Sequence, residues 1–464
     1  MLRRVLVRRA YNAGHWGSAR SQAVKMLDRN SSDSFAQSIV IRSLWNEQKY
    51  LEIIQYKHLW KDDLTQRYVR KAEDKVVPNS LSGDEIYVSH RYKELHKQQP
   101  VSFDEVVWNE KSMEENFVQE GSRLWFRFEH GYTFWDMPKT FNLKNTHPNL
   151  LMLTAELILG KWSKATKKKF QHNRPFGRQT GLSFSAGTDS SAAALVMPES
   201  TILGYHQRSF SSLLDHRNAS RLLDYIDTNK LRTTVRINSN HELIRTHYGH
   251  EAGFSTDFAC LCHLVLLADH FDFGAVATGM LLDNTWLWKG RKFRSFEQTQ
   301  YYNYWVERFR SAGLTLLFPI ASISEAGALS IVKQTEWVNH LNSCMRGDGM
   351  TGCGRCWKCF HKNGPLGRPF DIKANEIQSY LNRRPMPTCT HALWALQTMN
   401  LQDEVLDLSH LLEHDLSWWE GIYLPGLEIL PETYRGEITE KMYEFLEPME
   451  RPYKLEKVNH FNED

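Results

Sequence analysis

Residues 182–190 constrain the fold of this chain more than any other segment. A short apolar run at 182–184 enters a loop of small and hydroxyl residues, and an alanine-rich helix is expected to begin at Ser190. This order places unpaired backbone N–H groups at a helix N-terminus, where the helix dipole also favours negative charge. The loop at 185–190 therefore predicts an anion site at the end of a strand. The alternative is a serine-rich turn that only opens a helix.

Strand and helix patterns alternate between residues 181 and 364. Short apolar runs predict buried strands, and helical patterns lie between them. Alternation of this kind is typical of an α/β domain with a parallel sheet and helices on both faces, in which ligands bind beyond the carboxyl ends of the strands. The predicted strands are 182–184, 202–205, 233–237 and 275–277, and the predicted helices include 192–196 and 258–270.

The regions on either side have different patterns. Residues 1–100 are predicted to be helical: Ser31, Ser32 and Asp33 offer helix caps, and a second helix follows a break near Asn46, which together resemble a tetratricopeptide hairpin. Period-two alternation predicts a β-hairpin at 123–137, and His147-Pro148 leads into an apolar helix. A linker is expected at 78–83. The predicted domains are 1–100 (helical, tetratricopeptide-like), 101–170 (hairpin plus helix), 171–370 (the α/β domain) and 371–464 (helical).

Composition limits the classes of partner. The 464 residues include 57 Lys and Arg against 54 Asp and Glu, and the difference of +3 is too small to argue for a nucleic-acid partner, which is therefore not expected. No apolar run approaches the roughly 18 residues of a membrane-spanning helix. Residues 1–27 are basic up to Asp28, which is typical of a transit peptide or of the first helix of a helical domain. The basic run at 161–169 could contact phosphates or form a solvated linker.

Four of the seven cysteines cluster and predict a metal site. Four thiolates without a histidine or carboxylate are typical of a structural zinc site, and the alternatives are an iron–sulfur cluster or unligated cysteines. Cys260, Cys262 and His263 lie in a helical pattern and are expected in the core, while Cys389 is isolated in the sequence. An odd cysteine count with a metal cluster favours a reducing cytoplasm. The predicted zinc ligands within a knuckle at 344–359 are Cys344, Cys353, Cys356 and Cys359.

The loop at 185–190 resembles the Ser-Gly-Gly-x-Asp-Ser signature of the PP-loop ATP pyrophosphatases. It departs at Ala186, where that family usually has glycine, and we expect the methyl group to require a φ below zero. The resemblance implies a parallel-sheet, HUP-like nucleotide-binding domain that cleaves ATP between the α and β phosphates. The implied nucleotide-binding residues are Ser185, Ala186, Gly187, Thr188, Asp189, Ser190 and Gly279.

Two PP-loop groups are similar over more of the chain. The 7-cyano-7-deazaguanine synthases resemble it in the run 205–208, in Gly279 with Asp283, and at 318–320 before the cysteines. Those enzymes differ by a lysine near Glu325 and by an arginine at the position of Lys362. The MurL-type epimerases, which act on the terminal L-glutamate of UDP-N-acetylmuramoyl-L-alanyl-L-glutamate, are similar from about 104 to 440. That similarity lies in the hairpin, the helix after 147–148 and the runs 324–325, 343–346 and 356–360.

These resemblances imply an enzyme that uses ATP, Mg²⁺ and Zn²⁺ to adenylate a small carboxylate substrate, releasing AMP and pyrophosphate. Hydroxyl and N–H groups of the 185–190 loop would donate to the phosphate charge. Asp189 is the predicted Mg²⁺ partner, or a cap of the following helix, or both. Arg208 is either a clamp on phosphate or carboxylate or a surface arginine. Asp283 and Glu325 are candidates for metal or amine contacts.

The reaction after adenylation stays open at the level of sequence. An epimerase needs a base, for which His206, His250 and Glu251 are candidates, whereas a synthase-like ligase consumes ammonia or an amine. A different class is a non-catalytic nucleotide-binding scaffold whose N-terminal helices recruit a protein partner. A tRNA sulfur transferase would instead use one cysteine catalytically and hold less than one zinc per chain, and the near-neutral charge argues against it.

Overall fold

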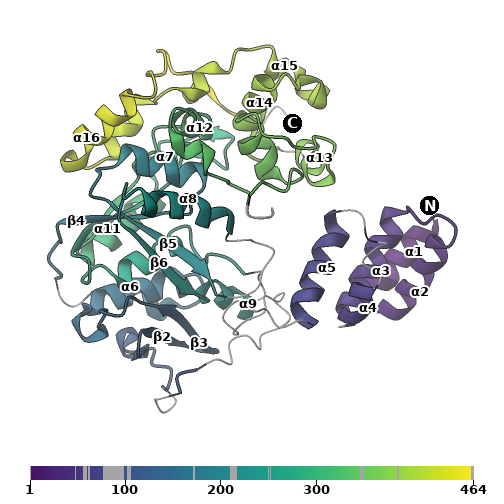
Figure 1. Cartoon of the computed structure of the whole chain (residues 1–464), viewed down its shortest axis with the longest axis horizontal. Coiled ribbons are helices and arrows are strands. Elements are labelled where there is room, and N and C mark those ends of the chain that lie inside the picture. The colour runs from purple at the N-terminus through teal and green to yellow at the C-terminus, as the bar shows by residue number, and fades with distance from the viewer. Residues whose placement is uncertain are drawn as a thin grey trace. The chain divides into compact units, whose positions relative to one another are not determined.

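The computed structural model describes most of the chain in two compact units (Figure 1). One unit comprises Met1–Leu95 with Ser209–Leu214, and the other comprises His96–Arg208 with Asp215–Asp464. The linker expected at 78–83 lies outside the described residues. The described residues are 2–47, 49–55, 60, 63–76, 99–101, 106–170, 173–209, 217–248, 250, 252–344, 350–383 and 386–460.

The first unit is helical, as predicted. Asp33 caps α3 by accepting a hydrogen bond from the backbone N–H of Ala36 at 3.1 Å, and α2 packs against both α1 and α3. Residues 1–27 form the first two helices, with Val7, Ala19 and Ala23 in the buried core. The helices are α1 (Leu2–Asn12), α2 (Trp16–Leu27), α3 (Ser34–Asn46), α4 (Tyr50–Gln55) and α5 (Asp63–Val76).

The second unit is built on a mixed sheet that has eight strands within the described residues. The hairpin predicted at 123–137 is β2 and β3, and together with the antiparallel β1 it extends a parallel sheet of five strands. The strand order is β1-β2-β3-β6-β5-β4-β7-β10. Each strand predicted from the sequence forms at its expected place. The strands are β1 (Phe117–Glu120), β2 (Arg123–Phe128), β3 (Gly131–Asp136), β4 (Gln179–Ser183), β5 (Ile202–Arg208), β6 (Thr234–Ser239), β7 (Phe273–Thr278) and β10 (Thr315–Leu317).

The strand order creates a switch point beside β4. The chain steps from β4 to β5 and β6 on one side, and then returns to place β7 and β10 on the other side. In open parallel sheets the crevice at such a reversal, beyond the carboxyl ends of the strands, is where ligands bind. The loop at 185–190 directly follows β4 and therefore lies at this crevice.

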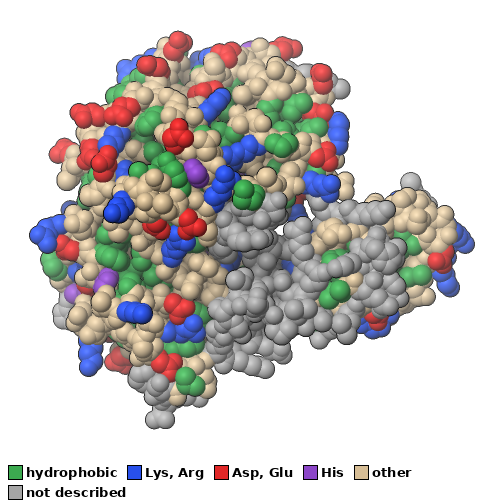
Figure 2. All heavy atoms as spheres, in the orientation of Figure 1, with side chains coloured by type: hydrophobic (Ala, Val, Ile, Leu, Met, Phe, Trp, Pro, Cys, Tyr) green, Lys and Arg blue, Asp and Glu red, His purple; other side chains and the backbone are tan. Residues whose placement is uncertain are grey.

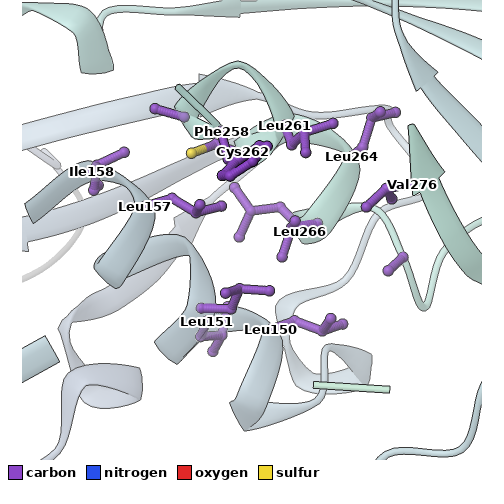
Figure 3. Packing of buried hydrophobic residues seen from close by; sticks show 14 of the residues in the cluster. Leu150, Leu151, Leu157, Ile158, Phe258, Leu261, Cys262, Leu264, Leu266 and Val276 are labelled. Atoms are coloured by element: carbon purple, nitrogen blue, oxygen red, sulfur yellow. The ribbon is translucent and has the colours of Figure 1, made fainter. Parts of the chain in front are cut away.

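Helices cover both faces of the sheet, because alternate residues of a strand point to opposite sides. Val276 of β7 packs on one face with Leu150 and Cys262, as Figure 3 shows, whereas Ala275 and Ala277 pack on the other. The first face carries α6 (Pro148–Leu159), α10 (Cys262–Leu266) and α11 (Gln300–Ser311). The second carries α7 (Thr188–Val196), α8 (Arg217–Thr228), α12 (Glu325–Lys333) and α16 (Glu432–Tyr443).

The α10 region corrects one prediction and confirms another. The helix expected over 258–270 is short: a 3₁₀ turn at Ala259–Leu261 leads into α10, which ends at Leu266. Burial nonetheless follows the prediction, since Cys262 and His263 are fully buried and Cys260 is partly buried. Burial raises the pKa of Cys260 to about 11, which keeps that thiol protonated.

The described part of the C-terminal region is mainly helical, as predicted for 371–464. Trp394, Trp419 and Tyr423 are buried in a cluster that also contains Phe360 of the cysteine knuckle. Helices α13 (Asn375–Leu381), α14 (Cys389–Thr398) and α15 (Ser409–Leu412) belong to this region, while α9 (Ile244–His247) and the small hairpin β8 (Leu287–Trp288) and β9 (Lys292–Phe293) precede it.

The surface agrees with the balanced composition. Basic and acidic side chains are interspersed over the face that Figure 2 presents. Lys161, Lys167 and Lys169 of the basic run are exposed. In the part of the chain that the structure describes, no helix is both long and apolar enough to cross a bilayer.

Candidate functional site

The 185–190 loop turns β4 into α7 at the switch point. Helix α7 begins at Thr188, two residues earlier than predicted, and Gly187 is its extended N-cap residue. The first N–H groups of a helix have no partner within it. The N–H of Thr188 donates to the Ser343 hydroxyl at 3.0 Å, whereas those of Asp189 and Ser190 face the end of the helix, which is suited to an anion.

Hydroxyl groups hold the loop in shape. The Ser190 hydroxyl accepts from the N–H of Ser185 at 3.1 Å and donates to the carbonyl of Gly187 at 3.2 Å. The hydroxyls of Thr188 and Ser343 lie 2.7 Å apart. Gly279 comes directly after β7 and lies against the backbone of the loop. A Cβ there would lie 3.2 Å from the carbonyl oxygen of Asp189, a close contact that favours glycine at that position.

The prediction for Ala186 was wrong. Its φ is +55°, in the left-handed region, although its side chain is fully buried. A left-handed conformation costs roughly 1–2 kcal/mol for a residue with a Cβ. The methyl group lies in the apolar cluster beneath α7, and burial of one such group contributes about 0.8 kcal/mol. The loop therefore keeps a glycine-like backbone while carrying alanine.

A buried lysine meets Asp189. Lys362 is 5% exposed, and its ammonium nitrogen lies 2.6 Å from both carboxylate oxygens of Asp189 and 3.2 Å from a carboxylate oxygen of Glu325. Burial would lower the pKa of Lys362, but these two carboxylates raise it well above its ordinary value. Lys362 is thus a permanent cation beside the 185–190 loop.

Glu325 is the centre of a buried network. It is the first residue of α12, after the N-cap Ser324, and it accepts from the His361 ring at 2.8 Å. Burial would raise the pKa of Glu325, but His361 and Lys362 hold it well below its ordinary value. Burial lowers the pKa of His361, so we assign this ring as neutral. The positive charge that balances Glu325 is then that of Lys362, and His361 contributes a hydrogen bond.

Asp283 completes the network from the loop after β7. Its Oδ2 accepts from the Glu325 N–H at 2.9 Å, and among the described residues its buried Oδ1 has no hydrogen-bond partner. Burial and the neighbouring charge of Glu325 raise the pKa of Asp283 to about 8. Asp283 therefore carries a proton at neutral pH and is not an ordinary carboxylate.

His391 of α14 also approaches Glu325. Its Nε2 lies 3.2 Å from a carboxylate oxygen of Glu325 and 2.8 Å from the carbonyl oxygen of His361, so the tautomer with the proton on Nε2 donates to the His361 carbonyl and faces Glu325. Glu325, His361 and His391 together have the ligand-atom spacing of a metal site. With a proton on Nδ1 of His361 and on Nε2 of His391, the same atoms instead face the Glu325 carboxylate as hydrogen-bond donors, and Lys362 neutralises that carboxylate.

The other predicted residues lie elsewhere. Arg208, at the end of β5, forms a bidentate ion pair with Glu242, with one nitrogen–oxygen distance of 2.8 Å, and His206 lies 3.1 Å from the same carboxylate. Burial would raise the pKa of Glu242, but His206 and Arg208 hold it well below its ordinary value. His250 is exposed, and Glu251 lies outside the described residues.

The four predicted cysteines converge on one point. The Sγ–Sγ distances are 3.5 Å for Cys344 and Cys356, 3.7 Å for Cys356 and Cys359, and 3.9 Å for Cys353 and Cys359. Four sulfurs at about 2.3 Å from a tetrahedral Zn²⁺ lie about 3.8 Å apart, so the group fits zinc. The N–H of Gly354 also donates to the Cys359 sulfur at 3.2 Å, which stabilises a thiolate.

In the sequence, Lys362 stands out only as a departure from a family pattern. The turn Cys359–Asn363 is a π-helix, which begins at a cysteine of the knuckle and carries His361 and Lys362 toward the 185–190 loop. Rare π-helical turns occur frequently at functional sites. A basic residue three positions after the last cysteine was the available signal.

The comparisons with known proteins add one match. Residues 304–459 match a family of unknown function, DUF6395. That range contains the cysteines, Glu325 and Lys362, and excludes the 185–190 loop. No curated protein and no solved structure matches the chain.

Proposed function

We propose that this protein is an ATP-dependent enzyme that adenylates a substrate carboxylate and releases pyrophosphate. One observation carries the proposal: a loop of hydroxyls and helix N–H groups lies at the switch point of a parallel sheet, with a buried lysine beside it. A switch point predicts a ligand, the helix terminus predicts an anion, and the lysine adds a positive charge.

The roles of the residues follow from their placement. ATP would supply the AMP that converts a carboxylate into a reactive mixed anhydride, with Mg²⁺ offsetting the phosphate charge. Ser185, Ser190 and the first N–H groups of α7 would bind the phosphates as they gain charge. Lys362 would exchange Asp189 for a phosphate oxygen, which frees the Asp189 carboxylate toward the ion. Protonated Asp283 would donate a hydrogen bond.

Zinc bound by the four cysteines would act structurally. A site with four sulfur ligands has no open position for substrate. The metal would instead fix the turn Cys359–Asn363, and with it the position of Lys362. This arrangement supports an enzyme over a non-catalytic scaffold, because Lys362 and its partners form a buried charge network that packing alone does not require.

The specific reaction that we favour is epimerisation of a glutamyl-terminated cell-wall precursor, as in the MurL-type enzymes. Activation of a carboxylate acidifies the adjacent Cα–H, so that a base can remove the proton and return it on the other face. Water would then hydrolyse the mixed anhydride, which restores the carboxylate and releases AMP. Ligation in the manner of the deazaguanine synthases is the alternative. The two reactions differ because only ligation consumes ammonia.

Carboxylate-dependent exchange of labelled pyrophosphate into ATP tests the proposal. The zinc-loaded protein is incubated with ATP, Mg²⁺ and candidate acids, and we expect at least one acid to stimulate exchange. Asp189→Asn should lower the rate by about 100-fold or more, because the loss of a group positioned in the transition state has that magnitude. The control is Asp272→Asn, at an exposed carboxylate just before β7, where the strand begins and not where the 185–190 loop lies.

Two results would refute the proposal. Absence of exchange with every acid, together with no ATP binding at millimolar concentration, would leave only a zinc protein. ATP binding that is unchanged in Asp189→Asn, without turnover, would favour the scaffold. Where exchange occurs, deuterium from solvent appearing at Cα of the recovered acid indicates epimerisation, and ammonia-dependent AMP release indicates ligation.

A further inference from the structure

A cavity near the 185–190 loop is rich in arginine. It has a volume of about 540 Å³ and lies between α8 and the cysteine knuckle. Its lining includes Arg221, Arg355, Arg368, Asn342, Asn363 and Asp371. Two lining residues are next in the chain to residues that contact the 185–190 loop. Asn342 precedes Ser343, whose hydroxyl accepts from the N–H of Thr188, and Asn363 follows Lys362, which binds Asp189.

Two of these arginines, Arg221 and Arg368, contact neutral oxygens among the described residues. Among the described residues, no carboxylate lies within ion-pair distance of Arg221 or Arg368; the contacts of these two arginines are with neutral oxygens. Arg221 donates to the Met350 carbonyl at 3.3 Å, and Arg368 to the Asn363 side chain at 3.3 Å. The Asp371 carboxylate accepts from the N–H of Lys373 at 3.0 Å, in a local turn.

The two guanidinium groups repel each other. Burial and the neighbouring charge of Arg221 lower the pKa of Arg368, and the negative charge of Cys359 opposes this only in part. Like charges held together at a cavity are unfavourable unless an anion lies between them. Guanidinium groups bind carboxylate and phosphate oxygens bidentately, which suits an oxyanion of either type.

We propose that this cavity binds a second oxyanion of the acid substrate, a carboxylate or phosphate separate from the carboxylate that is activated. This inference rests on the proposed adenylation. It narrows the substrate class to acids with at least two anionic groups. A glutamyl terminus meets this requirement with its second carboxylate, whereas an acid with one carboxylate on a neutral heteroaromatic ring does not.

Calorimetry on the full-length, zinc-loaded protein tests this. The nucleotide site is first saturated with α,β-methylene-ATP, and inorganic phosphate and glutarate are then titrated in separate arms, which distinguish a phosphate from a carboxylate. We expect one equivalent of at least one probe to bind, and Arg221→Gln to weaken that binding at least about tenfold, as for a charged hydrogen bond. The control is Arg178→Gln, an arginine with a 90% exposed side chain just before β4.

Three other results would overturn the inference. Absence of probe binding while the nucleotide analogue binds would show that the cavity holds no anion, and the proposed function would stand. Equal weakening by Arg178→Gln would show unspecific charge attraction. Loss of zinc from Arg221→Gln, measured by metal analysis, would show that the arginine balances the charge of the four thiolates. Failure of the analogue itself to bind would count against the proposed function instead.

Discussion

The proton on Asp283 leads to the sharpest prediction. Its pKa of about 8 in the folded protein compares with an ordinary 3.8. A group whose pKa is raised by folding contributes stability below its unfolded pKa, and that contribution is lost as the pH rises through the folded value. Between these limits each pH unit changes stability by about 1.4 kcal/mol. From pH 5 to pH 8 the wild type should therefore lose about 4 kcal/mol that Asp283→Asn does not lose.

Urea unfolding at pH 5, 6, 7 and 8 measures this difference. Asparagine still accepts the Glu325 N–H but does not titrate, so the free energies of unfolding of the two proteins should diverge as the pH falls, with the wild type gaining. Zinc binding is also pH-dependent, but it affects both proteins equally. Asp272→Asn, at an exposed carboxylate, should show no such divergence. A difference that stays constant within about 1 kcal/mol across this range would show that Asp283 is ionised throughout.

Three further predictions concern the metal, the lysine and the loop. Metal analysis should find one zinc per chain, and Cys356→Ser should lose it together with several kcal/mol of stability, since zinc binding contributes to folding. Lys362→Met should destabilise the protein by about 3 kcal/mol in urea unfolding, because the largely buried Glu325 and the partly exposed Asp189 lose their cation, and a smaller loss in Lys362→Arg would confirm that charge is the cause. Ala186→Gly should change stability by less than about 1 kcal/mol, since relief of the left-handed conformation opposes the loss of a buried methyl; a larger loss would contradict that balance.

Local patterns predicted the parts of this fold that depend on neighbouring residues. The Asp33 cap, the hairpin β2–β3 and the convergence of the four cysteines follow from spacing along the chain. The charge network does not, because Lys362 and Asp189 are 173 positions apart and meet only through the sheet order and the π-helical turn. The positive φ of Ala186 was missed because the turn from β4 into α7, rather than the local preference of alanine, imposes that conformation.

The π-helical turn has a consequence for cells that run short of metal. The turn begins at Cys359, a predicted zinc ligand, and its fourth residue, Lys362, presents its ammonium group to Asp189 of the 185–190 loop. Under the proposed function, zinc starvation or oxidation of the thiols would release the turn and thereby stop the reaction, with no inhibitor bound at the 185–190 loop. Metal supply and redox state would then set how much of the protein is active.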